Sequence, residues 1–250
     1  MTKKLLLAAF VAALAFTSCK KDPAPTPEPQ TVIRLASEEN IFSSGMMTMT
    51  TYSNFVWENG ILMREVDSIV LPMMTMVYHN QMSYENGNLM KIKEEDNKWQ
   101  YSFTYEDGLL KTFLNVMEGD STSWGKVTAY NADGNVEEVL SYDNFKTTKW
   151  TLTWENGDAV KVVEDILEPA ELVATNVYTF TYDDKTSAYT GISLANVIID
   201  GNGTRVARCM SKHNMKEEGY TYEYNEKDML ISVVSEGDST YFHYIEQTIE

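Results

Sequence analysis

The chain has 250 residues and carries 20 Lys and Arg against 37 Asp and Glu, which gives a formal net charge of -17. Its 43% hydrophobic and 12% aromatic content excludes a disordered chain, a collagen and a multi-span helical membrane protein. Proteins bind nucleic acids with Lys and Arg that displace counterions, and this chain has the opposite net charge. No nucleic-acid partner is therefore expected.

The N-terminus has the three parts of a secretory signal. Lys3 and Lys4 are followed by an apolar run over residues 5–16 and then by the small residues Thr17 and Ser18. The run is shorter than the roughly 20 residues that cross a bilayer. The position of Cys19 resembles the lipobox of bacterial lipoproteins, although Phe16 stands where that motif usually has Leu. The resemblance implies that residues 1–18 are removed and that Cys19 is acylated, which would anchor the protein in the membrane.

Residues 19–30 are expected to form a tether. Four of the chain's six prolines alternate here, at Pro23, Pro25, Pro27 and Pro29, and alternating proline favours an extended polyproline II spacer. The residue after Cys19 is a lysine rather than the aspartate that retains lipoproteins at the inner membrane. An outer-membrane lipoprotein is therefore expected, on either the cell-surface or the periplasmic face. Residues 31–250 are predicted to form a single β domain of repeated hairpins.

A short phrase recurs along this domain. It consists of an aromatic residue, an Asn-Gly or Asp-Gly turn, and an aliphatic residue five positions after the aromatic. Such turns accept positive φ at both central residues and join antiparallel strands. The phrase occupies residues 57–62, 84–89, 105–110 and 154–159, with longer variants at 130–136 and 224–230. Each phrase is predicted to be a hairpin tip, in which Trp57/Leu62, Tyr84/Leu89 and Tyr105/Leu110 are cross-strand pairs.

Period-two alternation before these tips indicates half-buried strands, as in the segments 99–105, 150–154, 178–182 and 220–224. No comparable stretch shows a helical period. The predicted fold is all-β, an antiparallel up-and-down meander of about a dozen strands in a strongly curved or barrel-like single sheet, because so long a sheet must curl or close to protect its edges.

The lipobox, the Pro-rich tether and the repeated Tyr-Glu-Asn-Gly hairpins together resemble lipoproteins of unknown function with a porin-like β-meander, found in gut Gram-negative bacteria. The hairpin tips also loosely resemble the YD repeats of large secreted toxin shells. These resemblances cover residues 50–235. They imply a fold and an envelope location, and they imply no catalytic residues.

Catalytic motifs are scarce. The chain has three histidines and no Gly-x-Ser-x-Gly motif. Cys209 and His213 are expected to point the same way along one strand, but they belong to no recognisable motif. We therefore predict no enzyme activity, no catalytic residue, no cofactor and no metal site.

Aromatic rows are the best candidates for ligand binding. Trp99, Tyr101, Trp150 and Trp154 alternate with polar residues on two predicted strands, and such rings either stack on sugars or form the inner face of a curled sheet. The leading interpretation is a non-enzymatic lipoprotein that binds a ligand or assists assembly. The alternatives are a glycan-binding accessory lipoprotein and a carbohydrate-active hydrolase. Besides the membrane, the expected partner is a glycan or an envelope protein.

Overall fold

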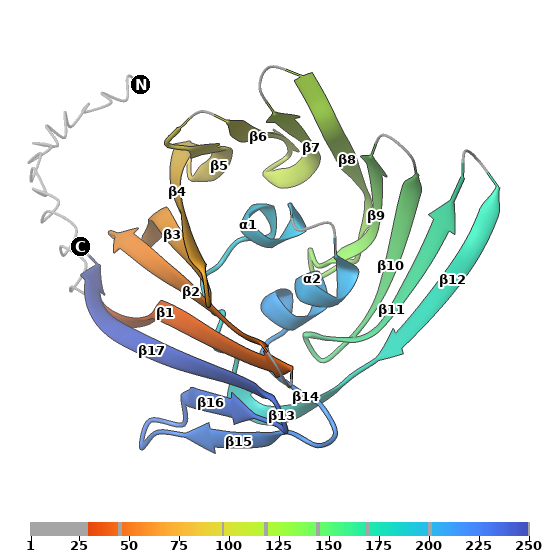
Figure 1. Cartoon of the computed structure of the whole chain (residues 1–250). Coiled ribbons are helices and arrows are strands. Elements are labelled where there is room, and N and C mark those ends of the chain that lie inside the picture. The colour runs from red at the N-terminus through yellow and green to blue at the C-terminus, as the bar shows by residue number, and fades with distance from the viewer. Residues whose placement is uncertain are drawn as a thin grey trace, which may run out of the picture.

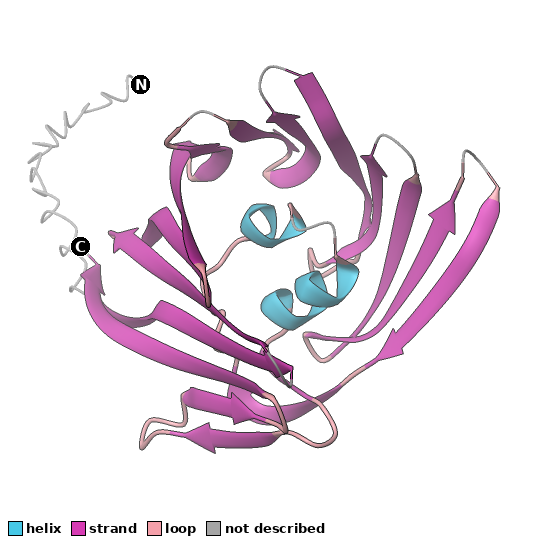
Figure 2. Ribbon diagram, in the orientation of Figure 1, coloured by secondary structure: helices cyan, strands magenta, loops and turns pink. Residues whose placement is uncertain are grey.

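The computed structural model describes residues 30–44, 47–96, 98–117, 120–143, 146–168, 171–199 and 202–249. Strands dominate these residues, and two short helices accompany them (Figure 2). Fifteen strands form one antiparallel sheet in the order β12 to β1 followed by β17, β16 and β15. The predicted all-β meander is therefore confirmed, with more strands than the dozen expected.

The strands of the large sheet are β1 (Gln30–Ser44), β2 (Met47–Glu58), β3 (Ile61–Leu71), β4 (Met74–Glu85), β5 (Asn88–Glu94), β6 (Trp99–Glu106), β7 (Leu109–Met117), β8 (Asp120–Tyr130), β9 (Val136–Asp143), β10 (Thr147–Glu155), β11 (Asp158–Leu167), β12 (Leu172–Thr179), β15 (Thr221–Tyr224), β16 (Leu230–Val234) and β17 (Asp238–Ile249).

The sheet curls strongly around an interior but does not close on itself (Figure 1). Its two edge strands are β12 and β15. In the chain, each of them is next to one of the two strands that do not belong to this sheet. β13 (Thr181–Thr186) comes after β12, β14 (His213–Lys216) comes before β15, and β13 and β14 pair with each other. A separate two-stranded sheet thus connects the edges of the large one.

The hairpin tips have the backbone that the turn residues predicted. Asn86 and Gly87 have φ values of 51° and 82°, and the tips at residues 59–60, 107–108 and 156–157 also combine two positive φ values. The cross-strand pairs Trp57/Leu62, Tyr84/Leu89 and Tyr105/Leu110 are also confirmed. Next to each of these pairs the register shifts by one residue, because Met63, Met90 and Lys111 have no register partner on the preceding strand, and such bulges bend the strand that contains them.

Seven aromatic side chains, five of them at hairpin tips, each donate a hydrogen bond to a backbone carbonyl of an earlier strand. The donors and acceptors are Trp57 to Leu35, Tyr84 to Leu62, Tyr105 to Leu89, Tyr130 to Leu110, Trp154 to Val136, Tyr182 to Ala159 and Tyr244 to Leu230. The donor-acceptor distances lie between 2.6 and 2.8 Å. We call this set the tip ladder.

Two helices lie inside the curve of the sheet, between β13 and β14 in the chain (Figure 1). They are α1 (Leu194–Ile198) and α2 (Gly203–Met210), two elements that the alternation of the sequence does not predict. The Asn202 side chain caps α2 by accepting from the backbone N–H groups of Thr204 and Arg205. At five and eight residues, the helices are too short to give a clear period in the sequence.

The core lies between these helices and the inner face of the sheet. Trp150 is fully buried. A Cβ built on Gly203, at the start of α2, would lie 3.1 Å from Cγ of Trp150 and 3.0 Å from Cγ1 of Val162. The absence of a side chain at Gly203 therefore lets α2 pack directly on β10 and β11. Among the described residues, no helix has the length and apolar character needed to cross a membrane.

Candidate functional site

The sequence-predicted aromatics lie in different surroundings. Trp99 and Tyr101 are on β6, half-buried, with their rings in an edge-to-face contact at 5.2 Å. Trp154 is also half-buried and belongs to the tip ladder. Trp150, the fourth predicted ligand-binding residue, is a core residue with no exposed surface. The acylation predicted at Cys19 lies outside the described residues.

Cys209 and His213 do not share a strand, which corrects the expectation from their spacing. Cys209 is buried on α2, whereas His213 is on β14. The backbone N–H of His213 donates to Oδ1 of Asp158 at 2.9 Å, and its Nδ1 lies 2.8 Å from Oδ2 of the same carboxylate. This contact fixes β14 to the start of β11, so the histidine has a structural partner.

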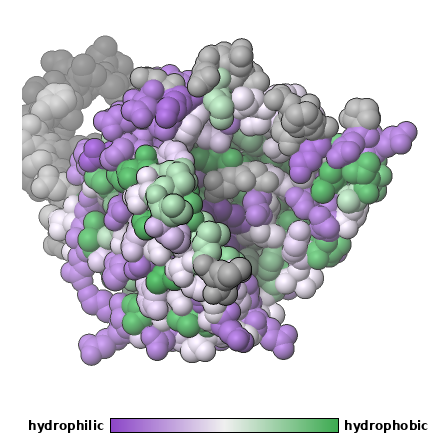
Figure 3. All heavy atoms as spheres, in the orientation of Figure 1, coloured by the Kyte–Doolittle hydropathy of each residue, from purple (hydrophilic) through white to green (hydrophobic). Residues whose placement is uncertain are grey.

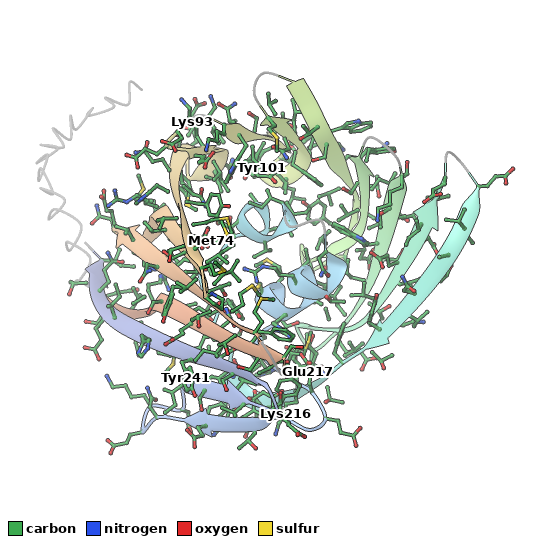
Figure 4. All side chains as sticks on the ribbon, in the orientation of Figure 1. Met74, Lys93, Tyr101, Lys216, Glu217 and Tyr241 are labelled. Atoms are coloured by element: carbon green, nitrogen blue, oxygen red, sulfur yellow. The ribbon has the colours of Figure 1, made fainter. Side chains whose placement is uncertain are left out.

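A cleft of about 280 Å³ lies between the β15–β17 end of the large sheet and the segments around β14 and α2. We call it the junction cleft. Residues of β1, β14, β15, β16, β17 and α2 line it, together with the segment that follows β13. Lys216 and Glu217 mark this region in Figure 4, whereas Tyr101 lies at a different part of the curve, beside β6. None of the four predicted aromatics lines the junction cleft.

Five aromatic side chains line the junction cleft. They are Phe42, Tyr189, Tyr220, Tyr222 and Phe242. Tyr189 and Phe242 meet edge to face, with ring centroids 6.0 Å apart. Burial is the main cause that raises the pKa of Tyr189 well above its usual value. The aromatics give the cleft rigid walls of the kind found in small-molecule sites.

Three ionisable side chains other than tyrosine also line the cleft: Arg208, Glu217 and Asp238. The guanidinium of Arg208 forms an ion pair with the Glu217 carboxylate. The backbone N–H of Glu217 donates to the hydroxyl of Tyr222 at 2.7 Å. Arg208 and Glu217 also border a second hollow of about 650 Å³, so the ion pair lies between the two spaces.

The amides in the junction cleft are already hydrogen-bonded within the protein. Asn214 donates to Asp183 and to the Thr186 carbonyl, and it accepts from the backbone N–H of Ala188. Asn40 accepts from Thr240. These bonds hold β13, β14, β1 and β17 together around the cleft, and they reduce the number of amide groups that a ligand can use.

The sequence predicts only part of this site. Tyr220 and Tyr222 belong to a segment whose alternation predicts a strand, but nothing in the local sequence indicates that this strand packs near α2 and β14. Among the described residues, no group of three or more His, Cys, Asp or Glu side chains is placed to hold a metal ion. On the face seen in Figure 3, hydrophobic patches alternate with hydrophilic ones.

Comparison with known proteins gives a likeness in fold. No protein-family model matches the chain, and no curated protein matches it. A solved structure of a porin-like protein from Bacteroides uniformis ATCC 8492 is similar, with a TM-score of 0.53 and 10% sequence identity. The similarity covers 84% of this chain and 96% of the other. At this identity the likeness shows the fold alone, so we conclude that the chain has a porin-like all-β meander fold.

Proposed function

We propose that this protein is an outer-membrane-anchored lipoprotein that binds a small ligand in the junction cleft without catalysing a reaction. The observation that carries the proposal is the aromatic lining of that cleft. Five rings from four parts of the chain surround one space, although they are as much as 200 positions apart in the sequence. A space of this size, near the lower end of the roughly 300 to 1,000 Å³ typical of ligand sites, suits a small molecule.

The leader and the fold support the envelope part of the proposal. Residues 1–18 and Cys19 have the pattern of a lipoprotein signal, and the similar solved structure is a porin-like protein. The test is a cell-fractionation experiment with a Cys19→Ala variant. The unchanged protein should sediment with outer membranes, and the variant should move to the soluble fraction. Equal membrane association of both would contradict the anchor.

The binding part is tested by isothermal titration of the full-length protein, purified in detergent, against small sugars, amines and organic acids. A Tyr220→Leu variant removes one ring from the cleft. A Tyr241→Leu variant removes a ring from β17, whose Tyr241 does not line the cleft, and it serves as the matched control. Binding that is lost only with Tyr220→Leu supports the cleft as the site.

The glycan-binding alternative is examined in the same titration, because tyrosine rings also stack on sugars. The four aromatics that the sequence suggested for glycan binding lie in the core, in the tip ladder and on β6, and none of them lines the junction cleft. Saturable sugar binding that survives Tyr220→Leu would point to a site elsewhere. Cleavage of a glycoside by the purified protein would favour the hydrolase alternative and contradict a non-enzymatic role.

A further inference from the structure

The charges that face the junction cleft do not cancel. Arg208 and Glu217 neutralise each other as an ion pair. Asp238, which lies opposite Phe42 in the β1–β17 register, takes part in no ion pair within the described residues. Within the described residues its side chain accepts one long hydrogen bond, 3.5 Å from the Tyr220 hydroxyl to Oδ2. One carboxylate in the cleft is therefore left without a cationic partner.

A second carboxylate lies next to the aromatic residues of the cleft. Glu38, on β1, is only 6% exposed, and its register partner on β17 is Phe242. The Asn40 amide donates to its Oε1 at 3.1 Å. After burial, the negative charge of Glu38 is the next largest cause that raises the pKa of Tyr189. This charge therefore acts on the cleft wall, and the chain as a whole, at -17, attracts cations and repels anions.

The positive groups around the cleft are already engaged. Arg208 is paired with Glu217, and Arg205, which also influences Tyr189, has a partner of its own. The ammonium of Lys216 lies 5.4 Å from the ring centroid of Tyr222. Lys216 lines the second hollow and not the junction cleft. The protein therefore already places a cation against the Tyr222 ring from outside the cleft.

Aromatic faces together with an unpaired carboxylate are the features that recognise an ammonium group. A neutral sugar would need several amide or hydroxyl partners. The amides of Asn214 and Asn40 are already hydrogen-bonded, and so are the hydroxyl groups of Ser187 and Thr240. A neutral ligand would also leave the charge of Asp238 without compensation, while an anion would be repelled by it.

We propose that the junction cleft binds a small organic cation, with its ammonium group between the Asp238 carboxylate and the rings of Tyr220 and Tyr222. This inference rests on the proposed function, because it names the ligand class of the same cleft. The Asp238 carboxylate supplies the opposite charge, and the aromatic rings supply cation–π contacts and exclude water.

The test is isothermal titration of the full-length protein in detergent with choline and with 3,3-dimethyl-1-butanol, which has the same shape but no charge. Methyl glycosides and small amines complete the panel. We expect choline to bind at least about tenfold more tightly than its neutral isostere, and less tightly as salt is added.

Two variants locate the charge. Asp238→Asn keeps the size of the side chain and removes its charge, and it should weaken choline binding by about tenfold. Asp133→Asn, in the exposed turn between β8 and β9, changes the net charge by the same amount outside the cleft and should leave affinity unchanged.

Each alternative result contradicts the inference in a recognisable way. Equal binding of choline and its isostere, or equal weakening by the two Asn variants, would show that Asp238 does not select the ligand. The protein could instead bind a methyl glycoside and no amine, and lose that binding in Tyr220→Leu. This result would contradict a cationic ligand and leave the proposed function standing. Binding of no compound in the panel would overturn both.

Discussion

The hydroxyl of Tyr84 donates a 2.6 Å hydrogen bond to the backbone carbonyl of Leu62. The register between β3 and β4 ends at Arg64 and Gln81, so the sheet provides no backbone N–H for this carbonyl at the tip. The tyrosine side chain takes that role. Because an aromatic in the next hairpin repeats the arrangement, the tip ladder continues the connection between hairpins beyond the point where backbone pairing stops.

Removal of this hydroxyl should therefore destabilise the fold. We expect Tyr84→Phe to lower the free energy of unfolding by about 1 to 2 kcal/mol, because a buried carbonyl loses its partner while the ring stays in place. The measurement is urea-induced unfolding. Tyr241→Phe is the control, since no hydrogen bond of its hydroxyl is found among the described residues, and it should change stability little. Equal effects of the two variants would contradict a structural role for the ladder.

The ladder also predicts loss of stability at alkaline pH. Burial is the main cause that raises the pKa of Tyr84, Tyr105, Tyr130 and Tyr182 to about 12. In the unfolded chain these hydroxyls ionise near pH 10. The unfolded state thus releases protons first, so the stabilisation is complete below about pH 10 and is lost as the pH rises toward about 12.

The alkaline prediction is checked by urea unfolding at a series of pH values, with tyrosinate absorbance followed in parallel. We expect the unfolding midpoint to fall over this range, and the fall to be smaller in Tyr84→Phe. A midpoint independent of pH, with all tyrosines ionising near pH 10 in the folded protein, would show that these hydroxyls are not protected.

Gly125 on β8 marks a position where the sheet tolerates no side chain. A Cβ there would lie 2.1 Å from Cζ of Phe113 and 2.8 Å from the carbonyl oxygen of Leu140. Gly125→Ala should cost about 1 to 3 kcal/mol or more, because Phe113 is itself buried and must move. Gly108→Ala is the comparison: its φ is +80° with no atom near the new Cβ, so it should cost only about 1 kcal/mol of backbone strain. A larger loss at Gly108 would contradict this packing.

Variants of Trp150 test whether this residue serves the core or the ligand site. Trp150→Ala should lower the free energy of unfolding by about 3 to 5 kcal/mol. Trp150→Phe should cost less, partly because the buried Nε1 of Trp150 has no hydrogen-bond partner among the described residues. Titration of the Phe variant should show ligand affinity equal to that of the unchanged protein. Binding lost in a folded Trp150→Phe variant would return this residue to the ligand site.

The sequence by itself determined the local architecture of the sheet. Asn-Gly and Asp-Gly turns fixed the hairpin tips because few other residues accept positive φ at two successive positions. Period-two alternation then assigned the faces of strands such as β6 and β10, and it correctly paired Tyr84 with Leu89. These features depend on neighbours within one hairpin, so they can be predicted from the order of residues.

Only the tertiary structure decided which aromatics are core and which line a cleft. Trp150 and Tyr222 have the same alternating pattern in the sequence, yet α2 covers Trp150, whereas Tyr222 lines the junction cleft. The path of the chain through β13, the two helices and β14 produces this difference. It depends on contacts between residues far apart in sequence, such as Asp158 with His213 and Asn40 with Thr240, and no local pattern encodes how such distant segments meet.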